Sequence, residues 1–189
     1  MHLLRSLPAF AICALLAPLP SAAEPVAGAP YVPTPTAIVD RMLTLAKVGP
    51  NDYLIDLGSG DGRLVITAVG KYKARGGMGI DLNPDLVKLA TDNAQKAGVA
   101  GQVSFVAGDL FAADVEKATV VTLYLLPSMM SDVEAKLRKE LKPGTKVVSH
   151  DYPLPTWKPV EVDKFDSQEK IPISGTTRTV LLLYRVPER

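Results

Sequence analysis

The sequence contains almost no cysteine. Cys13 is the only one among 189 residues, and it lies in an apolar run from Leu7 to Leu19. If that run is removed, the chain has no thiol, which excludes disulfide bonds, thiol chemistry and a cysteine metal site. Net charge is equally scarce, because 21 basic and 20 acidic residues leave a formal value of +1. We therefore expect no basic surface for nucleic acid and no nucleic-acid partner.

The N-terminus lacks acidic residues and contains a run without polar positions. Arg5 is followed by the apolar run Leu7–Leu19, which two prolines interrupt, and then by the small residues Ser21–Ala23. This order predicts a signal peptide over residues 1–23 and export to the periplasm or secretion. The run is too short to cross a bilayer comfortably, so we expect no stable membrane span. A buried helix is the alternative, and the prolines argue against it.

The remaining sequence is long enough for one domain. Residues 24–33 are rich in proline and alanine and predict a tether, which leaves 34–189 as the folded domain. Apolar residues make up 47% of the chain and charged residues 22%, as in ordinary globular proteins. Two other interpretations of the N-terminus stay open: an uncleaved membrane anchor, and a cytosolic protein with a misassigned start.

A dinucleotide-binding Gly-x-Gly-x-x-Gly motif is missing. An apolar strand, Tyr53–Leu57, does lead into a glycine-rich turn, but Arg63 stands where the third glycine is required, and a helix follows to about Tyr72. Asp56 lies inside the strand and would repel a pyrophosphate, whereas it suits a ligand that carries ammonium and sulfonium groups. We therefore expect S-adenosylmethionine to bind at Asp56 and the turn residues Gly58, Ser59, Gly60 and Gly62.

Two further carboxylates follow strand-like segments. Asp81 ends an expected strand from Gly76 and can accept hydrogen bonds from ribose hydroxyls, and Asp109 ends another and can accept from an adenine amino group. Leu82 and Leu110 flank these acids and can cover the adenine faces. Each aspartate alone is more typical of a turn or helix cap than of a binding site. Their occurrence in order at neighbouring strand ends carries the inference.

Strands and helices alternate through most of the chain, which predicts an α/β fold. We expect a Rossmann-like, seven-stranded, mostly parallel sheet with helices on both faces. Thr34 is expected to cap the first helix and Ser131 a later one. The chain ends with two expected strands, 160–165 and 178–186, joined by a polar loop, which predicts a C-terminal antiparallel hairpin. The expected strands before that pair are 53–57, 76–81, 102–107, 119–126 and 146–149.

These motifs resemble a known group of enzymes. Asp56-Leu-Gly-Ser-Gly-Asp-Gly62, Gly79-Ile-Asp81 and Gly108-Asp109 are similar to the cofactor motifs of class I S-adenosylmethionine-dependent methyltransferases. Tyr31-Val-Pro-Thr34 and Tyr124-Leu-Leu-Pro-Ser-Met-Met130 add a resemblance to the small lysine methyltransferases of the ATP synthase c subunit and the ADP/ATP carrier, and to their bacterial relatives. One departure is Asp81, where the mitochondrial enzymes are expected to carry glutamate.

The resemblance implies methyl transfer to a protein lysine. By strand order, Tyr124, His150 and Asp151 should lie near the transferred methyl, and Tyr31 is expected to fold over the site as a lid. We name Tyr124, Asp151 and Tyr31 as candidate catalytic residues, while a structural role stays open for Tyr124 and for His150. A small-molecule methyltransferase and a non-catalytic domain that binds S-adenosylmethionine are the alternative functions.

Overall fold

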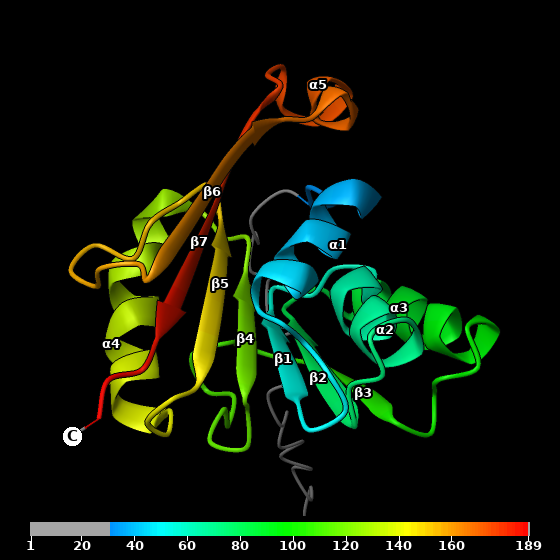
Figure 1. Ribbon diagram of the computed structural model, residues 1–189. Coiled ribbons are helices and arrows are strands. Elements are labelled where there is room, and N and C mark those ends of the chain that lie inside the picture. The colour runs from blue at the N-terminus through cyan, green and yellow to red at the C-terminus, as the bar shows by residue number, and fades with distance from the viewer. Residues whose placement is uncertain (1–30, 189) are drawn as a thin grey trace, which may run out of the picture.

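The computed structural model describes residues 31–188. A single seven-stranded sheet forms its centre (Figure 1). The strands are β1 (Tyr53–Leu57), β2 (Gly76–Asp81), β3 (Val103–Ala107), β4 (Val120–Leu123), β5 (Lys146–His150), β6 (Glu161–Asp166) and β7 (Arg178–Arg185). The helices are α1 (Thr36–Leu45), α2 (Arg63–Gly70), α3 (Pro84–Lys96), α4 (Met130–Glu140) and α5 (Ile171–Ser174), with 3-10 turns η1 (Pro127–Met129) and η2 (Gln168–Lys170).

The strand order confirms the expected fold. It runs β3-β2-β1-β4-β5-β7-β6. Neighbours from β3 to β5 are parallel, and β7 is antiparallel to both β5 and β6. The chain proceeds outward from β1 in one direction and then returns to β4 on its other side. This reversal between β1 and β4 is the switch point at which open α/β sheets bind ligands, beyond the carboxyl ends of the strands.

Each face of the sheet is covered by helices, as the sequence predicts (Figure 1). On one face, α1 and α2 pack on alternate strand residues through a cluster that includes Met42, Leu54 and Val65. On the other face, α4 packs on the intervening residues through a cluster that includes Val121 and Leu137. All four residues of β4 are buried, because a central parallel strand is covered on both sides.

Local sequence sets the bounds of α3 well. The Asn83 side chain accepts a hydrogen bond from the backbone of Asp85 at 2.9 Å, and Pro84 occupies the first helical position. Two other cap predictions are wrong. Pro35 is the N-cap of α1 and no side chain caps that helix. Ser131 lies inside α4, because η1 winds directly into the helix and leaves no separate cap.

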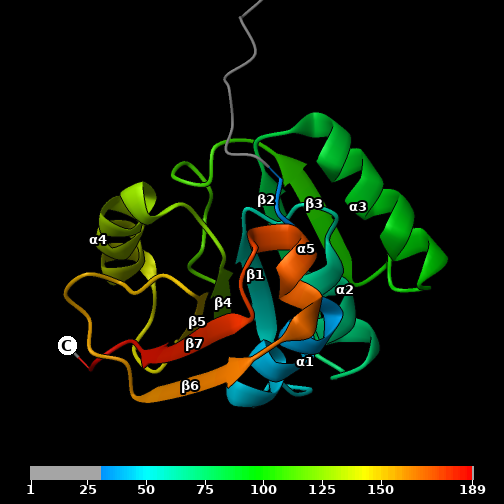
Figure 2. The ribbon, with the colours of Figure 1, turned by 90° about the horizontal axis from the view of Figure 1, so that it is seen from above.

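The C-terminal pair of strands carries more structure than the expected polar loop. Between β6 and β7 the chain forms η2 and α5. This segment, residues 167–177, is called the arm below. It rises beyond the carboxyl ends of the strands and overhangs β1 and α1 (Figures 1 and 2). The β4 strand is also shorter than expected, because the chain leaves the sheet after Leu123 to form the loop that leads into η1.

Some predictions fall outside the described residues. The signal peptide over 1–23 lies there entirely, as does most of the tether over 24–33. Within residues 31–188, none of the helices combines the length and the apolar character needed to cross a bilayer.

Candidate functional site

The glycine turn between β1 and α2 is built from left-handed backbone. Gly58, Gly60 and Gly62 have φ values of 81°, 53° and 80°. The N–H groups of Gly58 and Ser59 both donate to the carbonyl of Ile80 at 2.9 Å, so the turn is fastened to the end of β2. Residues that carry a Cβ are strained at such φ values, which explains the alternating glycines.

All three glycines are also positions of close approach, and the approaches at Gly58 and Gly60 enclose the turn. A Cβ on Gly58 would lie 2.8 Å from a methyl of Leu125, which follows β4. A Cβ on Gly60 would lie 2.5 Å from the ring of Tyr31. The turn is therefore enclosed by the loop after β4 on one side and by the N-terminal segment on the other.

Arg63 fixes that N-terminal segment. Its guanidinium makes a bidentate ion pair with Asp61, at 2.9 and 2.7 Å, and donates to the carbonyl of Thr34 at 2.7 Å. The Tyr31 ring lies on Gly60 and is 43% exposed. Burial, and then the charge of Asp61, raise the pKa of Tyr31, so its hydroxyl is neutral at physiological pH. The residue that breaks the dinucleotide motif thus holds the segment that carries Tyr31.

Asp56 lies beneath the turn and is only 3% exposed. Its carboxylate accepts a hydrogen bond of 2.6 Å from Thr122 on the neighbouring β4. Burial raises its pKa to about 7, the Thr122 hydroxyl opposes this, and the charges of Asp81 and Asp61 add to it. A cation placed near Asp56 would favour its ionised form.

The other two expected cofactor acids lie where the sequence places them, at the ends of β2 and β3. Asp81 accepts from the N–H of Gly60 at 2.8 Å and from that of Asn83 at 2.9 Å, so it joins the glycine turn to α3. Asp109 is exposed and accepts from the N–H of Phe111 at 2.9 Å. Their neighbours Leu82, which is exposed, and Leu110, which is half-buried, complete this row.

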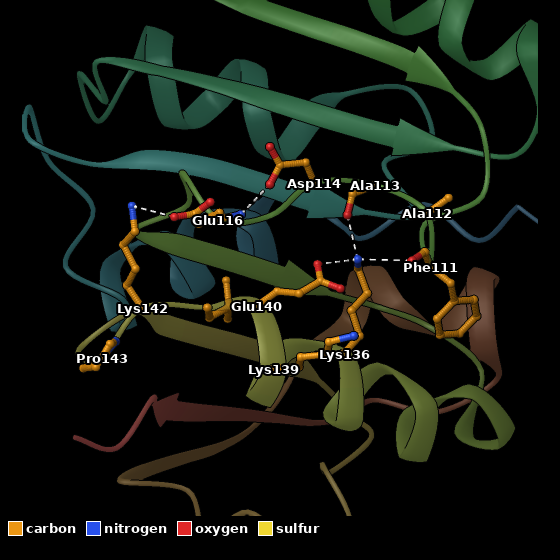
Figure 3. Close-up of a pocket in the computed structure, with 11 residues that line it drawn as sticks. Phe111, Ala112, Ala113, Asp114, Glu116, Lys136, Lys139, Glu140, Lys142 and Pro143 are labelled. Carbon is orange, nitrogen blue, oxygen red and sulfur yellow. Dashed lines mark hydrogen bonds and ion pairs between the residues drawn. The ribbon is translucent and has the colours of Figure 1, made fainter. Parts of the chain in front are cut away.

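A buried lysine braces the loop that follows Asp109. The side chain of Lys136, on α4, is 6% exposed. Its ammonium donates to the carbonyls of Phe111 and Ala113, at 3.2 and 2.6 Å, and to Glu140 at 2.6 Å (Figure 3). The cavity around it measures about 530 Å³ and does not reach the glycine turn. Lys136 therefore holds the loop beside the expected adenine position.

Aromatic rings line the ends of β4 and β5. Tyr124 stacks on His150 with ring centroids 4.0 Å apart, and on Tyr152 at 6.4 Å. His150 is fully buried, and within the described residues neither ring nitrogen has a hydrogen-bond partner. Burial lowers the pKa of His150 to about 4 and raises the pKa of Tyr124 to about 12. Both side chains are therefore neutral at pH 7.

Asp151 follows this aromatic cluster but its carboxylate is already engaged. One oxygen accepts from the N–H of Val180 on β7, and the other pairs with the ammonium of Lys170 in η2. The candidate catalytic residues Tyr124 and Asp151 thus lie together, just beyond the ends of β4 and β5. Tyr31, the third candidate, lies across the glycine turn from them.

Sequence reasoning missed four residues of this region: Thr122, Arg63 as an anchor, Lys136 and Lys170. Lys136 lies three residues after Val133, on the apolar face of α4, and a charged residue on such a face is a usable signal. Lys170 gives no comparable signal, because the arm has no periodic pattern and its partner is distant in sequence.

The turn fits the cofactor expected from the sequence. Gly58 and Gly60 let Leu125 and Tyr31 lie directly against the turn, which encloses the expected binding position. The buried hydroxyl of Ser59 has no hydrogen-bond partner in the described part of the chain. This hydroxyl can therefore donate a hydrogen bond to a bound ligand or accept one from it. Asp56 can hold an ammonium group, and Asp81 and Asp109 present carboxylate oxygens to hydroxyl or amino groups.

Known proteins match much of this chain. Residues 56–161 match the ANTKMT methyltransferase domain family. The chain is 45% identical over 137 residues to a protein-lysine N-methyltransferase of Saccharolobus islandicus, covering 72% of this chain and 85% of the archaeal protein. It is 41% identical to the adenine nucleotide translocase lysine N-methyltransferase of Mus musculus, covering 70% of this chain. It spans only 57% of the mouse protein.

A solved structure is similar in both sequence and fold. It is described as an RNA methyltransferase from Salinibacter ruber in complex with S-adenosyl-L-homocysteine. It shares 49% sequence identity with this chain and has a TM-score of 0.74, covering 84% of this chain and 95% of the Salinibacter chain. The ligand bound there is the methyl donor after loss of its methyl group.

Proposed function

The chain belongs to the ANTKMT methyltransferase domain family and is an S-adenosylmethionine-dependent methyltransferase, and we propose that its acceptor is the side-chain amine of a protein lysine. The archaeal relative, of which the chain spans 85%, is named for that acceptor, and so is the mouse relative.

One observation carries the proposal. The acceptor side of the switch point is an uncharged aromatic wall, Tyr124 stacked on His150 and Tyr152, beside the glycine turn that Leu125 contacts. S-adenosylmethionine supplies an electrophilic methyl group on a sulfonium. A lysine can attack it only as the neutral amine, and an apolar wall disfavours the ammonium form. An aromatic face also tolerates the methylated, cationic product.

Different residues of the chain bind different parts of the cofactor. We assign the ammonium end of the cofactor to Asp56 and the turn, the ribose to Asp81, and the adenine to Asp109 with its flanking leucines. Tyr31 covers the turn and excludes water. The protein contributes position and a dehydrated surface, which is what a direct displacement requires.

RNA is the second candidate acceptor, because the Salinibacter structure is described as an RNA methyltransferase. Two features of this chain favour lysine instead. The formal net charge of +1 provides little attraction to a phosphate backbone. The loop after β4 reads Tyr-Leu-Leu-Pro, from Tyr124 to Pro127, where enzymes that methylate planar amides carry Asn-Pro-Pro-Tyr. No side-chain amide is available there to clamp a base.

The test uses methyl-labelled S-adenosylmethionine and three acceptor pools from a lysate: proteins, total RNA and small molecules. We expect the label in protein, resistant to ribonuclease, and recovered as methyl-lysine by mass spectrometry. Label in RNA or in the small-molecule pool would overturn the lysine assignment. Cofactor binding without turnover in any pool would indicate a non-catalytic binding domain. The Gly58→Ala variant serves as the control without a competent cofactor turn.

A separate proposal concerns residues 1–23, which lie outside the described residues. On the charge, apolar run and small-residue exit described above, we propose that they direct export. Fractionation followed by mass spectrometry of the N-terminus tests this. A chain in the cytosol that still begins at Met1 would contradict it, and a membrane-bound chain that begins there would indicate an uncleaved anchor.

A further inference from the structure

The end of β5 leads into an aspartate in an unusual conformation. Asp151 has a φ of 65°, in the left-handed region that residues other than glycine rarely adopt. Its N–H donates to the carbonyl of Val180 at 2.7 Å, and its own carboxylate accepts from the N–H of Val180 at 3.2 Å. Two reciprocal contacts with β7 thus fix the direction of the Asp151 side chain.

The second carboxylate oxygen is paired with a buried lysine. Lys170 comes from η2 in the arm, and its side chain is 3% exposed. Its ammonium also donates to the carbonyl of Arg178. A buried ion pair is weak evidence for stability, because desolvation of the two charges offsets their attraction. An apolar residue could connect the arm to the sheet at least as well, so the retained pair calls for another explanation.

The other titratable groups that interact with the pair are neutral at pH 7. Within the described residues, Asp151 interacts with His150 on β5, with Tyr124 after β4 and with Lys170. From β7, the backbone N–H of Val180 donates to the Asp151 carboxylate, and the backbone carbonyl of Arg178 accepts from Lys170. The Nε2 atom of His150 lies 3.6 Å from the Asp151 carboxylate. Burial keeps the pKa of His150 at about 4, so this imidazole does not neutralise the aspartate at pH 7.

We infer that Lys170 is present to cancel the charge of Asp151, so that the acceptor side of the site is electrically neutral and a lysine enters as the free amine. The inference rests on the proposed lysine acceptor. An unpaired carboxylate beside Tyr124 would raise the pKa of the incoming amine by favouring its ammonium form. That form has no lone pair for attack. Asp151 and Lys170 are therefore positioning residues that act through charge.

The group transfer itself balances without either residue reacting. The acceptor ammonium releases its proton to solvent before attack. The amine lone pair then forms the new N–C bond as the C–S bond breaks, and the sulfur keeps the electron pair of that bond. The charge of the pair only decides how much of the bound acceptor is in the reactive form at a given pH.

The first test is the pH profile of kcat/KM with a lysine acceptor. Lys170→Met leaves the carboxylate unpaired, so we expect the acidic limb to move up by about one pH unit, which is about a tenfold loss of rate below the limb. Asp151→Asn leaves the ammonium unpaired and should move the limb in the opposite direction. Lys170→Arg should stay close to the parent, and so should the double variant that combines Asp151→Asn with Lys170→Met. If the acidic limb of the pH profile lies at the parent's position in all four variants, the inference is overturned.

The second test needs no turnover. The imidazole of His150 can be titrated by NMR, and the only other histidine, His2, can be identified by its substitution. Lys170→Met should raise the pKa of His150, because the attraction to Asp151 remains while the repulsion from Lys170 is gone. Asp151→Asn should lower it. If the two variants move His150 in the same direction, the pair does not set the local charge.

Lys136 provides the matched control. It is a similarly buried lysine bonded to two carbonyls and one carboxylate, but it lies on the adenine side. Lys136→Met should weaken binding of S-adenosylmethionine several-fold and leave the pH limb in place. If the parent protein methylates no lysine at all, the proposed function fails. The NMR titration would still decide whether Lys170 sets the charge around Asp151.

Discussion

The two sides of the carboxyl edge are built in different ways. On the donor side, at the ends of β1, β2 and β3, backbone groups do most of the work: the turn is held by amides bonded to Ile80 and by Asp81 bonded to Gly60. On the acceptor side, at the ends of β4, β5 and in the arm, side chains from distant segments meet. Tyr124 stacks on His150, and Asp151 pairs with Lys170.

The difference follows from what each side must recognise. The donor is a fixed small molecule, so backbone geometry and glycines can be matched to it once. The proposed acceptor, a lysine of another protein, has to arrive, react and leave. A surface of neutral rings, beside an ion pair whose two charges cancel, requires little of the acceptor amine except that it lose a proton. Side-chain contacts of this kind can also change without disturbing the cofactor turn.

The largest effect is expected where the two sides touch. Gly58→Ala forces a side chain into left-handed backbone and places it 2.8 Å from Leu125. Strain of this kind costs about 1–3 kcal/mol, so we expect the affinity for S-adenosylmethionine to fall about 10- to 100-fold. Isothermal titration of the folded variant measures this.

Gly98→Ala is the matched control for that change. Gly98 has a similar φ of 72° after α3, but a Cβ there meets nothing within 4 Å. We expect a modest loss of thermal stability and unchanged cofactor affinity. If both alanine variants bind S-adenosylmethionine equally well, the close packing of Gly58 against Leu125 does not matter for cofactor binding. The donor and acceptor sides would then not be coupled through this contact.

The contrast also explains how much the sequence could predict. The bounds of β1 and β2, and the row of Asp56, Asp81 and Asp109, follow from short motifs because each is fixed by neighbours in the chain. The partners of Asp151 do not, because Lys170 reaches it only after β6 and β7 have paired. The failed cap prediction at Ser131 has a local origin instead, because η1 runs directly into α4 and places Ser131 inside the helix.

A smaller effect is expected from the buried acid of the donor side. Asp56→Asn keeps the hydrogen bond with Thr122 but removes the charge, and we expect S-adenosylmethionine to bind about tenfold more weakly at pH 8. In the parent protein, affinity should rise from pH 6 to 8, because the pKa of Asp56 is raised to about 7 and only its ionised form attracts an ammonium. The asparagine variant should lack this dependence.

The raised pKa of Asp56 also makes the stability of the fold depend on pH. Because the pKa of Asp56 is higher in the folded than in the unfolded chain, its protonation stabilises the fold below about pH 4, and that contribution is lost as the pH rises through 7. Thermal unfolding without cofactor should show this slope in the parent and less of it in Asp56→Asn. Asp85→Asn, which changes an exposed acid in the first turn of α3, should behave like the parent. Identical slopes in all three proteins would place the titration elsewhere.

The smallest effect is expected on the acceptor side, from loss of a single hydroxyl. Tyr124→Phe keeps the ring stacked on His150, and within the described residues the hydroxyl makes no hydrogen bond that the change would break. We expect kcat/KM for the acceptor to fall about threefold, in the range of one neutral hydrogen bond to substrate, with cofactor affinity unchanged. Tyr124→Ala removes the ring as well and should lower kcat/KM further, again without affecting cofactor binding. If either variant weakens binding of S-adenosylmethionine as much as Gly58→Ala does, the two sides are not separable, and Tyr124 belongs to the donor site.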